Sequence, residues 1–248
     1  MRTIKKVASH IFIDGFGGMT QGLFATLIIG TMIQQIGLLI GGSTGNVIYL
    51  LGKAAAALTS AGIGVGVAVK YGESPLVTVS AAVAAMVGGY AGKITGGTFF
   101  VDGNAVLAGP GEPLGAFIAA FAGITCGHLV SGKTKVDIIV TPVITIGAGS
   151  VVGLLVGPPI SQMMTGLGSI INWATEQRPF IMGIVVSVVM GMVLTLPISS
   201  AALGIILNLS GLAAGAATIG CCCNMVGFAV ASYRENKFGG LVAQGLGT

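Results

Sequence analysis

The sequence predicts an all-α polytopic membrane protein, with about seven or eight transmembrane helices in 248 residues. Apolar residues make up 54% of the chain and charged residues only 7%, whereas soluble domains average about 25% charged residues. Glycine is unusually abundant, with 43 residues, and it lies within apolar segments. A bilayer span needs only about 20 apolar residues. The eleven Lys or Arg and seven Asp or Glu leave five long charge-free stretches, at residues 15–52, 74–92, 113–132, 138–175 and 179–233.

The pattern of apolar stretches and turns predicts one membrane domain over residues 1–248. Residues 3–18 are expected to form an amphipathic helix at the membrane surface, with apolar side chains at helical spacing and lysines opposite. In span 136–157, Gly149, Gly153 and Gly157 repeat every four residues, which favours close helix contact. The predicted spans are residues 19–42, 46–69, 75–92, 113–131, 136–157, 179–197 and 211–233.

Three segments interrupt this pattern and are predicted to be re-entrant, broken or interfacial. Residues 93–112 hold five glycines, a proline and three acidic or amide side chains, yet they also contain apolar patches. They are either a re-entrant segment buried in protein or a surface loop. Residues 158–178 are half polar and suit an interfacial or re-entrant stretch. Residues 196–209 begin with Leu-Pro-Ile-Ser-Ser, which predicts a helix break or hairpin tip, because proline removes a backbone donor.

Acidic side chains beside a broken apolar segment are the strongest candidates for a solute site. Asp102 and Glu112 flank the glycine-rich break together with Asn104, and Pro113 places Glu112 at a helix start. Carboxylates in such a place would supply acceptors to a hydroxyl-rich solute, a cation or a proton. The alternative is a solvated loop on the outer face.

Other polar residues inside apolar segments have a weaker claim on the same site. Gln34, Gln35, Ser199 and Ser200 carry no charge, and such groups most often form hydrogen bonds between helices. The two serines are favoured because they occupy the second break. His128 lies within a span, where an ionisable group suggests function, although a neutral imidazole near a helix end can simply pack or cap.

Several other kinds of function are disfavoured. The positive charges are too few and too dispersed for nucleic-acid binding. The residues Cys221, Cys222 and Cys223 are consecutive, so on a helix their side chains point about 100° apart and cannot converge on one ion. No cofactor, metal or catalytic residue is therefore expected. An intramembrane serine hydrolase using Ser43 of the GGSTG turn with His128 is a remote alternative, because this motif requires a strand-to-helix turn.

Several stretches taken together resemble one family, the EIIC-like membrane proteins of the bacterial phosphotransferase system. These stretches are residues 115–120, SGKTKVDIIVTPVITI (131–146), GLLVGPPI (153–160), INWATEQRPFIMGI (171–184), LTLPISSAALGI (194–205) and GLAAGAATIGCCCNMVGFAVASY (211–233). The resemblance implies a multi-pass transporter of the bacterial inner membrane. It also implies a homodimer with two re-entrant hairpins, alternating access, and a sugar or another small polar solute as substrate.

The resemblance also bears on the site and on partners. Sugar-transporting relatives bind the solute through a glutamate before a proline at a hairpin, and the counterpart here is Glu112 before Pro113. They use a histidine near the site, for which His128 is the candidate. No EIIA or EIIB domain is expected within the chain, so a link to a phosphorelay would need separate EIIA and EIIB proteins as partners. Family members continue for several helices past the position of Thr248, so the chain is expected to be incomplete at its C-terminus.

Two functional classes therefore compete. The first is a transporter with its site between the segments 94–112 and 196–209. The second is a membrane scaffold or sensor subunit that uses the same glycine-packed helices without moving a solute. Solute flux through reconstituted vesicles would separate the two.

Overall fold

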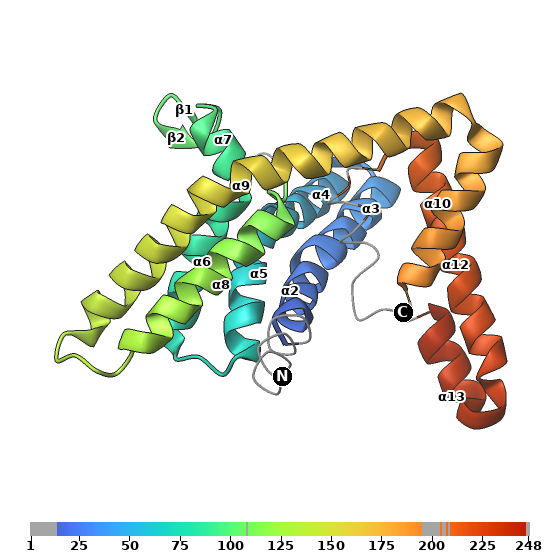
Figure 1. Ribbon diagram of the computed structural model, residues 1–248. Helices are drawn as coiled ribbons and strands as arrows, with labels where there is room; N and C mark the ends of the chain where they lie inside the picture. The colour runs from blue at the N-terminus through green and yellow to red at the C-terminus, as the bar shows by residue number, and fades with distance from the viewer. Residues whose placement is uncertain (1–13, 108, 195–203, 205–206, 208, 247–248) are drawn as a thin grey trace, which may run out of the picture. The chain divides into compact units, whose positions relative to one another are not determined.

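The computed structural model describes residues 14–107, 109–194, 204, 207 and 209–246 (Figure 1). Most of these residues are helical, which confirms the predicted all-α class. The chain divides into two compact units, residues 1–162 and 163–248, and each is described by itself below. The predicted surface helix at residues 3–18 lies largely outside the described residues, and so do Ser199 and Ser200.

Four of the described helical stretches are long and apolar enough to cross a bilayer, which supports a multi-pass membrane protein. A fifth candidate span is formed by helices α4 (Gly42–Ala57) and α5 (Thr59–Lys70), which are bent by 53° where they meet. The sequence prediction of seven or eight spans also counted the shorter apolar helices α6 (Pro75–Gly89) and α10 (Pro179–Val193). The four stretches are Phe16–Ile40, Pro113–Val130, Asp137–Gln177 and Gly211–Ala231.

The first unit begins with a helical hairpin whose arms touch through glycines. Its first arm contains helix α2 (Phe16–Leu23), the π-helical turn η2 (Phe24–Ile28) and helix α3 (Ile29–Ile40), and its second contains α4 (Gly42–Ala57) and α5 (Thr59–Lys70). A Cβ added to Gly18 of α2 would lie 2.6 Å from the Gly66 carbonyl oxygen of α5. A Cβ added to Gly37 of α3 would lie 2.7 Å from the carbonyl oxygen of Gly45. The arms therefore pack backbone to backbone, as small residues allow.

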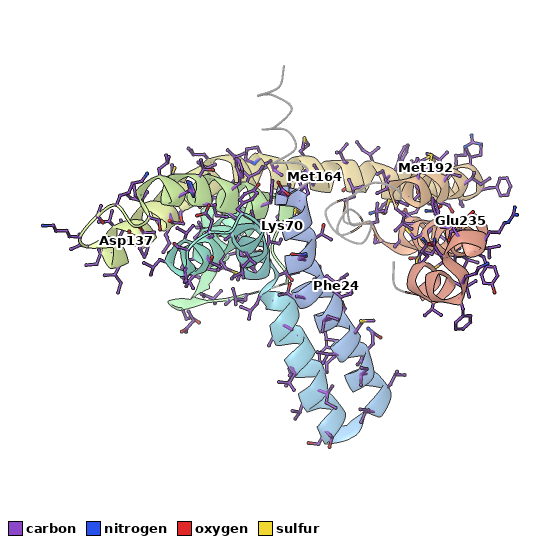
Figure 2. All side chains as sticks on the ribbon, turned by 90° about the horizontal axis from the view of Figure 1, so that it is seen from below. Phe24, Lys70, Asp137, Met164, Met192 and Glu235 are labelled. Carbon is purple, nitrogen blue, oxygen red and sulfur yellow. The ribbon has the colours of Figure 1, made fainter. Side chains whose placement is uncertain are left out.

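The distal part of this hairpin extends away from the other helices of the first unit (Figure 2). Its tip is formed by Gly41 and Gly42, whose φ angles of 65° and 64° suit glycine. Large apolar side chains cover its outside, with Leu39 and Leu51 more than half exposed. Such exposure suits contact with lipid.

Both arms of the hairpin depart from regular α-helix before they join the rest of the unit. In the first arm the departure is the π-helical turn η2, which contacts both α4 and α5. In the second arm it is Leu58, which is not helical and separates α4 from α5. Thr hydroxyls bind backbone carbonyls at both places: Thr26 donates to Gly22 at 2.7 Å and Thr59 donates to Ala56 at 2.6 Å. Side-chain hydroxyls of this kind commonly accompany bends in helices.

Helices α5, α6 (Pro75–Gly89), α8 (Pro113–Val130) and the first part of α9 (Asp137–Gln177) form the packed body of the first unit (Figure 1). The predicted close contact at the glycine repeat of α9 is confirmed. A Cβ added to Gly149 would lie 2.6 Å from the Ala119 carbonyl oxygen. One added to Gly153 would lie 2.8 Å from the Cα of Gly88.

The re-entrant alternative for residues 158–178 is wrong, because α9 continues as one helix from Asp137 to Gln177, while the interfacial alternative stays a prediction. Pro158 and Pro159 lie inside it and remove two backbone donors. Proline is tolerated in membrane helices where neighbouring groups or small local adjustments satisfy the freed carbonyls. The polar composition of this stretch therefore does not reflect a break in the backbone.

The second unit contains the end of α9, α10 (Pro179–Val193), α12 (Gly211–Ala231) and α13 (Tyr233–Leu246). Helices α10 and α12 pack through Val186, Met190 and Ala217, and the Gly220 position brings α12 against the backbone of Ser187. The Ser210 amide before α12 donates to the side-chain oxygen of Asn172 at 3.1 Å.

Candidate functional site

The glycine-rich segment at residues 93–112 contains a small β-hairpin followed by a segment that packs back into the first unit. Strands β1 (Phe100–Val101) and β2 (Asn104–Ala105) pair antiparallel, with Val101 opposite Asn104. The turn places Asp102 in the left-handed region, at φ 50°, and the side-chain amide of Asn104 donates to the Asp102 carbonyl at 3.3 Å. Asp102 and Asn104 are both exposed. Of the two readings left open, the surface loop therefore fits these two residues.

The chain returns from the β-hairpin through residues 109–112, here named the return strap. Three of its backbone groups form hydrogen bonds to two parts of the unit. The Tyr90 hydroxyl is within hydrogen-bonding distance of the Gly109 carbonyl, and the Ser60 hydroxyl donates to the Pro110 carbonyl at 3.0 Å. The Glu112 amide donates to the Gly89 carbonyl at 2.7 Å. The strap is thus fixed against α5 and against the C-terminal end of α6.

Gly111 allows this close approach in two ways. Its φ of 76° lies in the left-handed region, which an L side chain rarely adopts. A Cβ at this position would also lie 3.1 Å from the Gly89 carbonyl oxygen and would meet the Ser60 hydroxyl. The strap therefore requires glycine where it crosses the junction of α5 and α6.

Glu112 is the N-cap of α8 and its carboxylate binds the first free amides of that helix. Oε1 accepts from the Leu114 amide at 3.0 Å and Oε2 accepts from the Gly115 amide. Pro113 occupies the first helical position, where its missing N–H costs nothing. A negative charge here also interacts favourably with the helix dipole. Each carboxylate oxygen can accept more than one hydrogen bond, so the group retains capacity for a hydroxyl donor.

The Glu112 carboxyl is mostly buried although it precedes the spanning helix α8. This burial raises its pKa, and the amides of Gly115 and Leu114 act in the opposite direction. Desolvation penalises the charged form of a carboxyl, whereas hydrogen bonds to the carboxylate favour it. Burial and hydrogen bonding therefore act on the pKa of this carboxyl in opposite directions, and burial has the larger effect.

His128 lies near the opposite end of α8 and pairs with a residue that the sequence reasoning did not single out. Its Nδ1 lies 2.9 Å from Oε1 of Glu73, and the histidine side chain is 71% exposed whereas the glutamate side chain is 9% exposed. Sixteen residues separate His128 from Glu112, which at 1.5 Å per residue is about 24 Å along the helix. The structure therefore does not bring these two candidates together. The signal for Glu73 is its place in a polar turn between two spans.

The remaining candidates lie apart from the return strap or outside the described residues. Gln34 is half-buried on α3 and its side-chain amide lies 3.4 Å from the Gly30 carbonyl of the same helix, while Gln35 is exposed. Ser199 and Ser200 lie outside the part of the chain that the structure describes. Of the sequence candidates that the structure describes, only Glu112 belongs to the strap.

Two residues that position the strap, Ser60 and Tyr90, were missed from the sequence. Both side chains are almost completely buried, at 0% and 1% exposure. Their signal in the sequence is a hydroxyl-bearing residue within an otherwise apolar stretch, a pattern that usually indicates hydrogen bonding between helices and names no specific partner.

The structural context also bears on the hydrolase and metal hypotheses. Ser43 is exposed at the start of α4 and follows helix α3, so the strand-to-helix turn that the motif requires is absent here. Within the described residues, no group of three or more His, Cys, Asp or Glu side chains is arranged to hold a metal ion.

Comparison with known proteins identifies the family. The family model described as "Phosphotransferase system, EIIC" matches residues 13–248, which is nearly the whole chain. No curated protein and no solved structure matches the sequence. The extent of the family match, together with the multi-pass helical fold, shows that this chain belongs to the phosphotransferase system EIIC family.

Proposed function

We propose that this chain, a sugar-type membrane transporter subunit by its family, moves a small hydroxyl-rich solute across the bacterial inner membrane by alternating access, and that Glu112 binds the solute. The observation that supports this most is the placement of the Glu112 carboxylate. It is mostly buried at the N-terminus of a spanning helix, and backbone amides of its own helix occupy part of its acceptor capacity.

A carboxylate suits the recognition of a polyol for a simple chemical reason. It is an acceptor with two oxygens, and hydrogen bonds from hydroxyls to a charged acceptor are roughly twice as strong as those between neutral groups. Two adjacent sugar hydroxyls can bind the two oxygens of one carboxylate. The amides of Leu114 and Gly115 hold those oxygens in place before a solute arrives.

The experiment that tests this proposal is a solute screen by thermal shift on the purified protein in detergent or nanodiscs. A panel of hexoses, disaccharides and sugar alcohols provides the probes, and a binder raises the unfolding temperature as its concentration increases. Glu112→Gln should abolish the shift of any binder, because the amide replaces one acceptor oxygen by a donor. Glu176→Gln, at an exposed acid on α9, is the matched control and should keep the shift. A shift that survives Glu112→Gln would remove Glu112 from the site.

We also propose that phosphoryl groups reach the solute from separate EIIA and EIIB proteins and that the subunit works as a homodimer. Vesicles containing the protein should accumulate phosphorylated solute only when both partner proteins and a phosphoryl donor are present. Light scattering of the purified protein should give twice the chain mass of 24.5 kDa after subtraction of detergent. Solute flux in vesicles separates this function from the scaffold or sensor alternative, which predicts none.

A further inference from the structure

We propose that Tyr90 and Ser60 are positioning residues. They couple the bend between α4 and α5, in the helical hairpin that begins the first unit, to the Glu112 carboxylate. The coupling rests on the proposed function for its biological meaning, because it regulates the geometry of the proposed solute site. Its physical basis is independent of any solute. It consists of hydrogen bonds between the broken second arm of the hairpin and the return strap.

The first link is the Tyr90 hydroxyl, which contacts both the helical hairpin and the return strap. It lies 3.2 Å from the carbonyl of Ala57, the last residue of α4 before the bend, and it also reaches the Gly109 carbonyl at the start of the strap. A phenol has one hydrogen to donate, so the two carbonyls share a single donor. A displacement of Ala57 therefore changes the hydrogen bond that remains for Gly109.

The second link is Ser60, which belongs to the first turn of α5 just beyond the bend. Its hydroxyl donates to the Pro110 carbonyl at 3.0 Å, and the residue is fully buried. Gly111 packs against the same hydroxyl and against Gly89. The strap therefore follows the residues on either side of the bend, at Ala57 and at Ser60.

The strap passes any displacement directly to the candidate site. Only two residues separate Gly109 from Glu112, and the Glu112 amide is itself bound to the Gly89 carbonyl. Glu112 in turn positions its carboxylate on the first amides of α8. The bend and the carboxylate are thus connected through a short path in which residues 109, 110 and 112 each accept or donate a hydrogen bond.

The hairpin itself is built to change its angle at this level. The π-helical turn η2 in one arm and the non-helical Leu58 in the other lie next to one another, since η2 contacts both α4 and α5. π-helical turns frequently occur at functional sites, and kinks of this kind have local causes rather than general flexibility. Paired breaks allow the distal hairpin to tilt while the arms stay packed through their glycines. Such a tilt therefore alters the hydrogen bond that the Tyr90 hydroxyl donates to the Gly109 carbonyl of the strap.

Hydrogen–deuterium exchange of the full chain in lipid nanodiscs tests the coupling without a solute. Tyr90→Phe should raise the exchange rate at residues 109–115 about fivefold, the change that corresponds to losing one hydrogen bond. It should also raise exchange around the bend at residues 55–60. Tyr49→Phe, which removes a hydroxyl from α4 on the hairpin itself, is the control and should change neither segment. An increase confined to 109–115 would show a local structural role and would overturn the coupling.

A double-mutant cycle gives the second, independent readout. A Cβ in Gly30→Ala would lie 2.8 Å from the Ala56 amide nitrogen and from the Gly52 carbonyl oxygen, so the substitution pushes α3 away from α4 near the bend. It should raise exchange at residues 109–115 when Tyr90 is present and should add little to Tyr90→Phe. Additive effects in the double variant would contradict the proposal. Gly147→Ala, where an added Cβ meets nothing within 4 Å, controls for general loosening.

The outcomes separate this inference from the solute site. Glu112→Gln leaves the backbone links intact, so the exchange response to Gly30→Ala should persist in that variant. If exchange shows coupling but no solute shift depends on Glu112, the proposed function fails and the coupling stands. If the solute shift depends on Glu112 but exchange is uncoupled, the inference fails alone.

Discussion

Oε1 of Glu112 accepts a hydrogen bond of 3.0 Å from the backbone amide of Leu114, so the main candidate for solute binding also caps the helix that follows it. Substitutions of Glu112 distinguish its capping role from its proposed role in solute binding. Glu112→Ala removes both carboxylate oxygens that accept from the helix amides, and it should lower the free energy of unfolding by about 1 kcal/mol. Glu112→Gln keeps one carbonyl oxygen and should lose less. Thermal unfolding of the three proteins side by side checks this order, and equal loss in both variants would contradict the capping role.

Glycine contacts between helices give a second prediction, tested within one helix. Gly149→Ala would place a Cβ 2.6 Å from the Ala119 carbonyl oxygen, and overpacking of this kind costs about 1–3 kcal/mol. Gly147→Ala meets open space and should be neutral or slightly stabilising, because alanine favours helix over glycine. The measurement is the difference in unfolding temperature. If both variants behave alike, the packing of α9 on α8 is not as described.

The pair formed by His128 and Glu73 gives a third prediction. At about 24 Å along α8 from Glu112, it should not contact a small solute bound there. His128→Gln should therefore leave the half-saturating concentration of any solute found in the thermal-shift screen within twofold of the unsubstituted protein. Its effect on unfolding should stay near or below about 1 kcal/mol, because the glutamine amide can replace the histidine as a hydrogen-bond donor to the largely buried Glu73 carboxylate. A loss of binding as large as that of Glu112→Gln would place His128 in the site.

Tyr71 gives a prediction on pH. It follows α5, outside the span, and burial, with a smaller contribution from Asp14, raises its pKa from 10.0 to about 12. The unfolded chain thus loses this proton at lower pH than the folded protein does. The contribution to stability is complete below pH 10 and is lost as pH rises from 10 towards 12. The unfolding temperature should fall across this range less steeply in Tyr71→Phe, and parallel curves would contradict the shifted pKa.

Charge-free apolar stretches predicted the helical membrane fold because the bilayer leaves few alternatives for an apolar backbone. Composition was less informative about breaks. The half-polar residues 158–178 suggested an interfacial or re-entrant stretch, yet they belong to one long helix, whereas η2 and Leu58 interrupt the first hairpin without any proline. These bends depend on how two arms pack against one another, and a linear pattern does not contain that information.

The candidate site shows the same division. Glu112 could be selected from its sequence neighbours, because a glutamate before a proline after a glycine-rich segment predicts a capped helix start. Ser60 and Tyr90 could not be selected, since their partners are backbone carbonyls of residues 109 and 110, far away in sequence. Asp102 and Asn104 lie in the same glycine-rich segment as Glu112 and were candidates for the same reason. A tight turn between two short strands leaves them exposed.

The Glu112 carboxylate is proposed to bind a hydroxyl-rich solute. The most direct measurement is radiolabelled solute uptake into vesicles that contain the protein, with the best binder from the thermal-shift screen and the EIIA and EIIB partners supplied. Glu112→Gln should reduce uptake to the level of empty vesicles, while Glu176→Gln should transport normally. Uptake by Glu112→Gln that matches the unsubstituted protein would contradict the account.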